Sequence, residues 1–297
     1  MTVFDLAVAG RVLRLGERPL LMGIVNASPD SFSDAGAHPD LDARVELARA
    51  LVAQGADLLD VGGESAATRR APVEAAVEIE RVAPLIERIV AELGVVVSVD
   101  TYKPAVAEAA IAAGAAIVND VSALRDPELA AVCARTGAGL VLMHTRAAPK
   151  QRLQDPELYA DIVADVRALL AERMDVARAQ GVRDEQIVLD PGPDFAKTPA
   201  QTIAVMRRFA ELHDLGRPLL LAASRKDFVG ALIGREPRER LAGTLAATGF
   251  GVDAGAHILR VHDVAQTADF LRVRAALRGE VEVDSGLALD EALRHAR

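Results

Sequence analysis

The sequence has few aromatic residues and almost no cysteine, and both shortages restrict the kind of protein it encodes. Aromatic residues make up 3% of the 297 residues, and tryptophan is absent. Because Cys133 is the single cysteine, an internal disulfide framework is excluded and a reducing compartment is indicated. Cys133 lies in the apolar helical run ELAAVCARTG, which is more typical of a core residue than of a catalytic thiol. The core must therefore be built from aliphatic residues.

Positive charge is also in short supply. The chain has 34 lysine and arginine residues against 43 aspartate and glutamate residues, a formal net charge of −9. Nucleic acids and anionic membranes are bound by basic surfaces, so we expect neither a nucleic-acid nor a membrane partner. An anionic ligand has to meet arginine or lysine side chains that are placed locally.

Long uncharged runs are missing as well. No stretch reaches the ~18 apolar residues that a membrane span needs. The first residues lack the basic start and the continuous apolar segment of a signal peptide, and we expect a cytoplasmic protein. Residues 2–15 instead alternate apolar and polar residues around Gly10, which predicts a β-hairpin.

A short aliphatic run that ends in a polar residue recurs eight times. Helical stretches separate the runs, and residues that favour helix boundaries mark their ends. Pro104 suits the first turn of one helix and Gly114 suits its end. The runs lack strict alternation, which is typical of parallel strands covered on both faces. The runs span residues 20–26, 57–63, 95–100, 115–120, 139–144, 186–190, 218–226 and 257–262.

Eight such units without a proline- or serine-rich linker predict one α/β domain over residues 1–297, folded as a TIM (β/α)8 barrel. The hairpin at 2–15 would close the bottom of the barrel. Residues 279–297 follow the eighth helix as a C-terminal extension, to which we assign no function.

Polar residues end the aliphatic runs, and in such a barrel the carboxyl ends of the strands surround one cavity. A polar residue there can also cap the next helix, and this alternative stays open for Asp60 and Asp120. Asp100, Asn119 and Asp190 come from three different strands, and their carboxylate and amide groups suit a ligand rich in N–H donors. The full set is Asn26, Asp60, Asp100, Asn119, His144, Asp190, Lys226, Arg260 and His262.

Lys226, Arg260 and His262 add local positive charge to this acidic chain. Arg260 and His262 alternate on one strand, so both can face the mouth of the barrel. Lys226 precedes a predicted helix, where a cation opposes the helix dipole, so a merely solvated charge is disfavoured. A phosphate or pyrophosphate near the seventh and eighth strands is the expected occupant.

Several long segments, in order, resemble the signature blocks of the dihydropteroate synthase family, and together they cover nearly the whole chain. The resemblance implies a transferase of folate biosynthesis. It would join the pterin-methyl group of hydroxymethyl-dihydropterin pyrophosphate to the amine of p-aminobenzoate and release pyrophosphate. It also implies a Mg²⁺ cofactor, a homodimer and a target for sulfonamides. The segments include LMGIVNASPDSFSDAG, GADLLDVGGES, VSVDT, GAAIVNDVSAL, LVLMH, IVLDPG, FAKTP, SRKDFVG and GAHILRVHDV.

The resemblance also implies roles for individual residues. Asp100, Asn119, Asp190 and Lys226 would be the catalytic residues that hold the pterin, with Met143 packed near the ring. Pyrophosphate and Mg²⁺ would be held by Asn26, Arg260 and His262, with Asn26 as the metal ligand. Phe195 and Asp227 complete the substrate-binding set.

The chain departs from the family pattern on the side of p-aminobenzoate. Ala66 and Ala67 stand where the family has threonine and arginine, and whether Arg69 or Arg70 replaces that arginine stays open. In the sixth block the family's Ile-Gly-Phe-Gly-Lys becomes Pro-Asp-Phe-Ala-Lys over residues 193–197. The second half of the site is therefore predicted to be altered.

Asp227 is the sharpest departure, because the family has at this position a serine that helps to bind the carboxylate of p-aminobenzoate. Two carboxylates ~4 Å apart repel by a few kcal/mol at an effective dielectric near ~20, or about a thousandfold in affinity. Asp227 can instead cap the helix that starts there, or pair with Arg69, Arg70 or Arg225.

Other functions stay open beside dihydropteroate synthesis. One is a paralogue that joins the same pterin to a different nucleophile, and another is a pterin-binding protein without catalysis. A pterin-dependent methyltransferase shares the barrel but has little use for a pyrophosphate site at Arg260 and His262. A Schiff-base aldolase is disfavoured because Lys226 lies at the end of its strand, next to Arg225.

Overall fold

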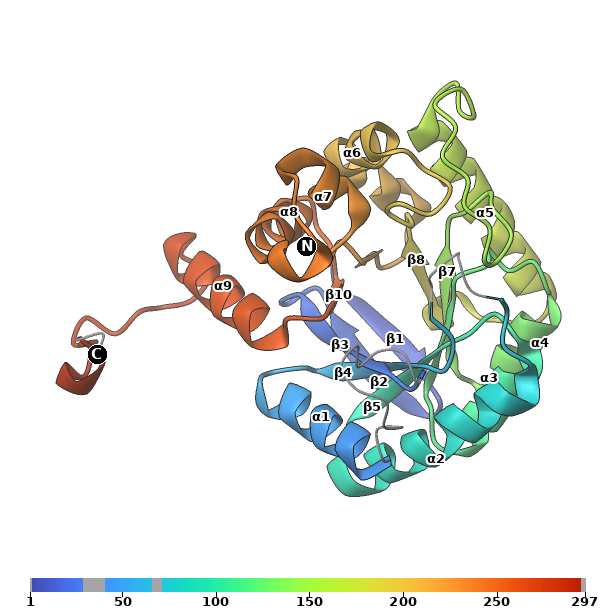
Figure 1. Cartoon of the computed structure of the whole chain (residues 1–297), viewed down its shortest axis with the longest axis horizontal. Coiled ribbons are helices and arrows are strands. Elements are labelled where there is room, and N and C mark those ends of the chain that lie inside the picture. Colours follow the sequence, from blue (N-terminus) through green and yellow to red (C-terminus); the bar gives the residue numbers. More distant parts are fainter. Residues whose placement is uncertain (1, 29–40, 66–70, 295–297) are drawn as a thin grey trace.

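Eight parallel strands close on one another at the centre of the molecule, and helices surround them (Figure 1). The computed structural model describes residues 2–28, 41–65 and 71–294. The strands follow the order β8-β7-β6-β5-β4-β3-β10-β9, and a bridge between Leu189 and Leu219 joins the two end strands. The predicted (β/α)8 barrel is confirmed. Its strands are β3 (Leu20–Asn26), β4 (Leu58–Gly62), β5 (Val96–Asp100), β6 (Ile117–Asp120), β7 (Gly139–Met143), β8 (Ile187–Asp190), β9 (Leu220–Leu221) and β10 (Ile258–Val261).

The strands lie within the predicted runs, and β9 differs most in length. It spans two residues, whereas the aliphatic run covers 218–226. Pro218 has no N–H to donate to a ladder. At the other end, Arg225 has a φ of +58°, which turns the chain out of the sheet.

The helices cover the outside of the barrel in chain order (Figure 1). Pro104 begins α3, as the sequence predicts, and Gly114 follows its end with a φ of +107°. Asp161 caps α5 by accepting from the N–H groups of Val163 at 2.9 Å and Ala164 at 3.2 Å. The helices are α1 (Leu41–Ala53), α2 (Ala75–Leu93), α3 (Pro104–Ala112), α4 (Glu128–Thr136), α5 (Ile162–Ala179), α6 (Pro199–Arg207), α7 (Asp227–Ile233), α8 (Leu241–Asp253) and α9 (Val264–Leu277).

The predicted N-terminal hairpin is present and closes the bottom of the barrel. Its strands β1 (Phe4–Val8) and β2 (Arg11–Leu15) pair antiparallel. Leu6, Val8 and Leu15 are buried in one cluster with side chains from the barrel interior, and each buried side chain of this size stabilises the fold by about 1.5–3 kcal/mol. Gly139 permits this close packing, because a Cβ there would lie 3.0 Å from Val8 Cγ1.

The described chain beyond α9 extends away from the barrel (Figure 1). A short 3-10 helix (Glu291–Leu293) is its one regular element within the described residues. Among the helices described here, none combines the length and apolarity that crossing a membrane requires. Cys133 is buried in α4, where burial raises the pKa of its thiol to about 12. This supports the prediction of a core cysteine.

Candidate functional site

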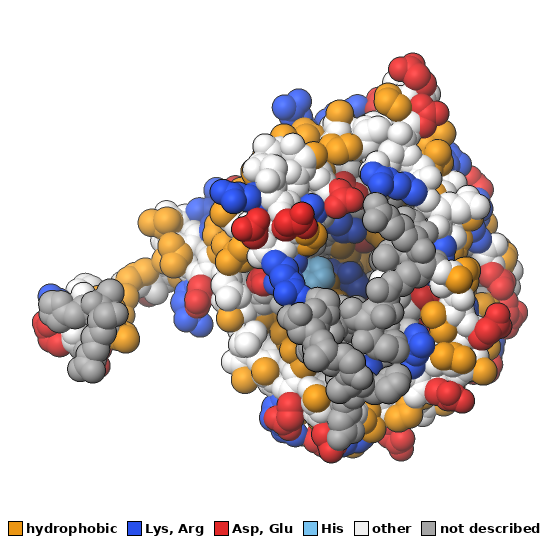
Figure 2. Space-filling view, in the orientation of Figure 1, with side chains coloured by type: hydrophobic (Ala, Val, Ile, Leu, Met, Phe, Trp, Pro, Cys, Tyr) orange, Lys and Arg blue, Asp and Glu red, His pale blue; other side chains and the backbone are white. Residues whose placement is uncertain are grey.

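The carboxyl ends of the strands bring most of the predicted site residues to one end of the barrel. Asp100 and Asn119 lie side by side at the ends of β5 and β6, and Met143 lies beside Asp190 at the ends of β7 and β8. Figure 2 shows a hollow near the centre of the molecule in which basic and histidine side chains are visible. This register follows from the parallel pairing, which aligns the end of each strand with its neighbour.

A buried network of charges forms the centre of this site. Arg260 Nε donates to Asp60 Oδ2 at 2.6 Å and Arg260 Nη2 donates to Asp100 Oδ2 at 2.7 Å. Asn119 Nδ2 also donates to Asp60 Oδ2, at 3.1 Å. Asp60 therefore belongs to the site and does not cap the next helix. Sequence alone did not assign Arg260 these two partners.

The network changes the proton affinities of its members. Burial, together with the charge of Asp60, raises the pKa of Asp100 to about 7, although Arg260 acts in the opposite direction. Burial tends to lower the pKa of Arg260, but Asp60 and Asp100 raise it above its ordinary value. The site thus holds a permanent cation beside a carboxyl group that titrates near neutral pH.

Asp190 and Lys226 form the opposite side of the site. Asp190 Oδ1 accepts from the N–H of Gly192 at 2.7 Å, and burial raises the pKa of this carboxyl. Lys226 Nζ lies 4.3 Å from the centre of the Phe195 ring, a cation–π contact. Burial lowers the pKa of Lys226, while Asp194 and Asp190 oppose that shift.

His262 lies beside Ser224 at the end of β10. Ser224 Oγ accepts from the backbone N–H of His262 at 3.2 Å and is 3.0 Å from His262 Nδ1. Burial, followed by the charges of Arg260 and Arg225, lowers the pKa of His262 to about 4. A lowered pKa favours the neutral imidazole of His262 at neutral pH, so Arg260 supplies the positive charge on β10.

The loop between β8 and α6 carries an unusual backbone. Gly192, Asp194 and Ala196 have φ values of +63°, +67° and +51°. For residues other than glycine, this conformation costs roughly 1–2 kcal/mol each. Gly192 is required, because a Cβ there would lie 2.2 Å from the carbonyl oxygen of His144.

A fully buried lysine, Lys197, holds this loop together. Its Nζ donates to the carbonyl oxygens of Gly192 and Phe195, both at 2.9 Å, and lies 2.8 Å from His144 Nδ1. His144 Nε2 in turn lies 2.9 Å from Asp165 Oδ1 on α5. Burial lowers the pKa of Lys197 to about 7. This role was not predicted from the sequence; a single lysine in a loop with two prolines and a glycine was the available signal.

These contacts also correct the expectation for His144. It ends the β7 run, as predicted, but its side chain is fully buried and engages Lys197 and Asp165. It packs against Tyr159, with ring centres 6.1 Å apart. His144 therefore supports the loop and does not share the network of Asp100 and Asn119.

Asp227 and Asp194 meet at the start of α7. Asp227 is 67% exposed and pairs with Arg240 Nη1 at 3.0 Å, which is neither a helix cap nor one of the partners expected from the sequence. Asp194 takes the capping position instead, because its carboxylate accepts from the N–H groups of Asp227 and Phe228. Arg225 is engaged by Asp263, with Nε 3.0 Å from Oδ2.

Asp120 has a structural role, which decides the alternative left open by the sequence. It is fully buried and accepts from the backbone N–H of Ser122 at 2.9 Å and from the Ser122 hydroxyl at 2.6 Å. It also accepts from the N–H of Leu124. Asp120 thus fixes the loop after β6, where Ala123 and Leu124 are left-handed.

Glu64 forms ion pairs with two further lysines at the mouth of the barrel. Lys103 Nζ lies 2.6 Å from Glu64 and 2.5 Å from Glu78, and Lys150 Nζ lies 3.2 Å from Glu64. The cluster ties together the loops after β4, β5 and β7. Glu64 lies in the GGES segment, and the sequence predicted no separate role for it.

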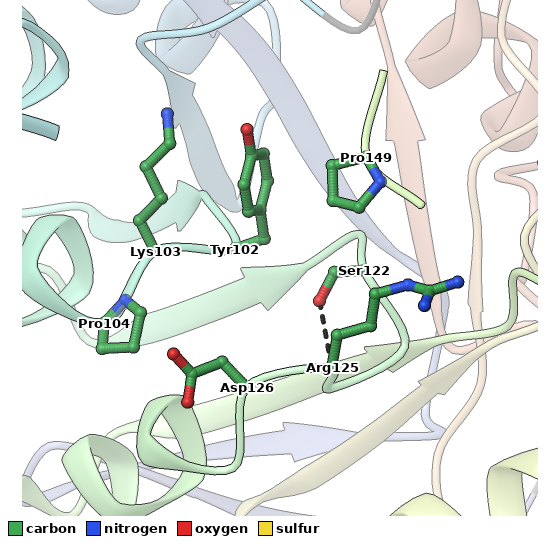
Figure 3. Close-up of a pocket in the computed structure, with 7 residues that line it drawn as sticks. All are labelled: Tyr102, Lys103, Pro104, Ser122, Arg125, Asp126 and Pro149. Atoms are coloured by element: carbon green, nitrogen blue, oxygen red, sulfur yellow. Dashed lines mark hydrogen bonds between the residues drawn. The ribbon is translucent and has the colours of Figure 1, made fainter. Parts of the chain in front are cut away.

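A separate cleft of about 340 Å³ lies between the loops after β5, β6 and β7 (Figure 3). Tyr102 and Lys103 stand on one side of it, and Arg125 and Pro149 stand on the other. It contains none of the residues that the sequence predicts as ligands. Its complete lining is Tyr102, Lys103, Pro104, Ser122, Arg125, Asp126 and Pro149.

Two predicted features lie outside the described residues. These are the loop of Ala66 to Arg70, with the open choice between Arg69 and Arg70, and most of the loop after Asn26. Asn26 itself ends β3 beside Gly62 of β4. In the described parts of the chain, no group of three or more histidine, cysteine, aspartate or glutamate residues could hold a metal ion.

The chain matches a protein family and curated relatives over most of its length. Residues 22–262 match the family described as pterin binding enzyme. The chain is 42% identical over 271 residues to a dihydropteroate synthase from Bacillus subtilis (strain 168), covering 91% of this chain and 92% of that protein.

Solved structures of dihydropteroate synthases resemble this chain over most of its length. Dihydropteroate synthase from Xanthomonas albilineans with 4-aminobenzoic acid is 42% identical, with a TM-score of 0.85, and the match covers 92% of this chain and 98% of that chain. The enzyme from Thermus thermophilus in complex with 6HMPPP is 39% identical, with a TM-score of 0.79, over 92% of this chain and 99% of that chain.

Proposed function

The chain belongs to the family of pterin-binding enzymes, and from this premise we propose that it is a dihydropteroate synthase. The reaction joins the methylene carbon of hydroxymethyl-dihydropterin pyrophosphate to the amine nitrogen of p-aminobenzoate, and the bond from that carbon to the pyrophosphate oxygen breaks. The observation that carries the proposal is the convergence of Asp100, Asn119 and Asp190 at the ends of three strands with Lys226, which lies after β9 at the start of α7.

These four residues suit the edge of a reduced pterin. Asp190, a buried carboxylate, can accept hydrogen bonds from the 2-amino group and the adjacent ring N–H, a bidentate pattern. Asp100 and Asn119 can hold the other edge of the ring, and Lys226 can donate to a ring oxygen or nitrogen. Met143, buried beside Asp190, supplies an apolar surface for the flat face of the ring.

The same groups can assist the departure of pyrophosphate. Positive charge that develops on the pterin is stabilised by carboxylates already held in place, without reorganisation during the reaction. Asp100 titrates near neutral pH, so its ionised form is available for this role. The barrel interior below the site is closed by the hairpin and the apolar side chains around it.

Pyrophosphate and Mg²⁺ are proposed to bind beside Asn26, Arg260 and His262. Mg²⁺ takes oxygen ligands, retains several waters and is often held partly by substrate phosphates. The amide oxygen of Asn26, at the end of β3, is a ligand of the kind that this ion takes. When bound, the ion neutralises charge on the leaving pyrophosphate.

The deciding experiment is to incubate purified protein with the pterin pyrophosphate, p-aminobenzoate and Mg²⁺, and to measure dihydropteroate and pyrophosphate. The proposal expects both products, and it expects EDTA to suppress their formation. An Asp190→Asn variant is expected to lose at least about tenfold in kcat/KM, because a charged hydrogen-bond acceptor is removed. Pterin binding without either product would support a non-catalytic pterin-binding protein instead.

We also propose that the protein is a cytoplasmic homodimer that associates through α7, α8 and α9. Exposed apolar side chains on these helices support the proposal, since contiguous apolar patches mark protein interfaces. Sedimentation equilibrium should give a dimer for the native chain and a monomer for Phe250→Asp. A monomeric native protein would overturn the proposed association. The exposed residues are Leu232, Ile233, Phe250, Val273 and Leu277.

A further inference from the structure

Asp194 has a backbone conformation that residues with a side chain rarely adopt. Its φ is +67°, a region that favours glycine because a Cβ meets steric conflict there. Its side chain makes contacts that offset this cost. Oδ1 accepts from the hydroxyl of Thr202 and Oδ2 accepts from the N–H of Phe228, both at 3.2 Å. A carboxylate is therefore fixed between α6 and the start of α7.

This carboxylate acts directly on the proposed site. Among the charges that influence the ammonium of Lys226, Asp194 has the largest effect and Asp190 the next largest. The residue after Asp194 is Phe195, whose ring lies 4.3 Å from Lys226 Nζ. Asp194, Phe195 and Lys226 thus form one wall of the site, which we term the α7 wall.

The two nearby arginines do not neutralise Asp194. Arg240 lies 3.0 Å from Asp227, and Arg225 is engaged by Asp263. Among the described residues, both arginines that adjoin the α7 wall therefore hold another carboxylate. Lys226 is influenced by both Asp194 and Asp190, so these three side chains together carry one net negative charge, although burial raises the pKa of Asp194.

The direction of the second substrate follows from the chemistry. Its amine nitrogen must reach the methylene carbon of the pterin inside the barrel. An aromatic amine that enters past the α7 wall would meet the Phe195 ring and the stem of Lys226, where ring contacts are available. Its far end would then lie toward the start of α7, where Asp194 already accepts the N–H of Phe228.

We propose that Asp194 is a specificity-determining residue, which makes the α7 wall favour an arylamine with an uncharged far end over one that ends in a carboxylate. The inference rests on the proposed function, because it concerns the amine that accepts the pterin-methyl group. Asp227 contributes less, because it is exposed and paired with Arg240.

Steady-state kinetics with p-aminobenzoate and p-aminobenzamide test the inference, since the two amines differ in charge at the far end. The variant is Asp194→Asn, which keeps an acceptor oxygen, tolerates a left-handed φ and removes the charge. It should raise the kcat/KM ratio of p-aminobenzoate to p-aminobenzamide about tenfold, chiefly through the KM of p-aminobenzoate. The KM of the pterin pyrophosphate should stay within about twofold.

Asp214→Asn is the matched control, because Asp214 is exposed and paired with Arg167 far from the site; its ratio should equal that of the native protein. Asp194→Gly, which also relieves the backbone conflict, replaces Asp194→Asn if the latter does not fold. A ratio unchanged in an active variant would overturn the inference and leave the proposed function intact. A native protein that releases no pyrophosphate with either amine would overturn the proposed function, and this inference with it.

Discussion

Arg260 Nη2 donates to Asp100 Oδ2 at 2.7 Å, and this contact favours the ionised form of Asp100 at the centre of the site. Asp100 accepts N–H groups of the pterin in its ionised form, so pterin affinity should rise with pH through about 7. Arg260→Met removes the opposing cation and should move that rise to higher pH. Pterin affinity measured by calorimetry between pH 5.5 and 8.5 checks this.

Arg14→Met is the control for this measurement, because Arg14 is exposed in the hairpin and pairs with Asp5. Its pH profile should match that of the native protein. Arg260→Met should also unfold more easily, by about 3 kcal/mol, since it removes the charged partner of both Asp60 and Asp100 and leaves Asp60 with the neutral amide of Asn119 as its donor. An unshifted profile in a folded Arg260→Met protein would contradict the role of Arg260.

Asp227→Ser should have a small effect on the use of p-aminobenzoate. The carboxylate is 67% exposed and paired with Arg240, so solvent and the arginine screen most of its repulsion. We expect the KM of p-aminobenzoate to fall by no more than about threefold, far less than the thousandfold of an unscreened pair. A fall of tenfold or more in this KM would show that Asp227 is the main residue that disfavours p-aminobenzoate.

Lys197→Met should release the loop between β8 and α6. The ammonium donates to the carbonyl oxygens of Gly192 and Phe195, and methionine leaves these buried acceptors unpaired at a cost of roughly 1–3 kcal/mol each. Hydrogen exchange of the peptide covering 191–198 should accelerate, and kcat/KM should fall at least about tenfold.

Lys197→Arg should also fail to hold the loop between β8 and α6, because a planar guanidinium does not reproduce the three-donor geometry of an ammonium. The chain has four lysines against thirty arginines, and all four lysines lie in loops after strands. Lys103→Met provides a comparison, since it disrupts the Glu64 cluster without touching the Lys197 loop. If hydrogen exchange at 191–198 is unchanged in Lys197→Met, Lys197 does not hold this loop in place.

His257 should make the protein less stable in acid. It is fully buried and its Nδ1 accepts from the N–H of Leu219 at 3.1 Å, which requires a neutral ring. Burial lowers its pKa from 6.5 to about 4. The unfolded chain therefore binds the extra proton between about pH 6.5 and 4, so this contribution to stability is present above 6.5 and is lost as pH falls.

The size of this effect can be measured against a variant that does not titrate. Between pH 7 and pH 5, the native protein should lose about 2 kcal/mol more unfolding free energy than His257→Asn. Urea denaturation at both pH values gives the difference. Equal losses in the two proteins would exclude His257 as a source of acid sensitivity.

Much of the fold could be predicted from the sequence, because its signals are local. An aliphatic run ended by a polar residue marks a buried strand, and its recurrence indicated the barrel. The signal for the hairpin at the bottom was equally local, because alternating apolar and polar residues around Gly10 define two strands joined by a turn. β9 was predicted too long because the left-handed conformation of Arg225 depends on contacts with distant residues such as Thr244 and Asp263.

The sequence by itself determined which side chains stand at the strand ends, because parallel strands must present their carboxyl ends together. Asp100, Asn119 and Asp190 were predicted in this way, whereas Lys226, predicted at a strand end, lies after β9 at the start of α7. Tertiary structure alone decided how these charges pair: Arg260 with Asp60 and Asp100, Asp227 with Arg240, and Lys197 with His144. Each partner lies on a different loop or strand, and only closure of the barrel fixes which loops meet and so which charges are neutralised.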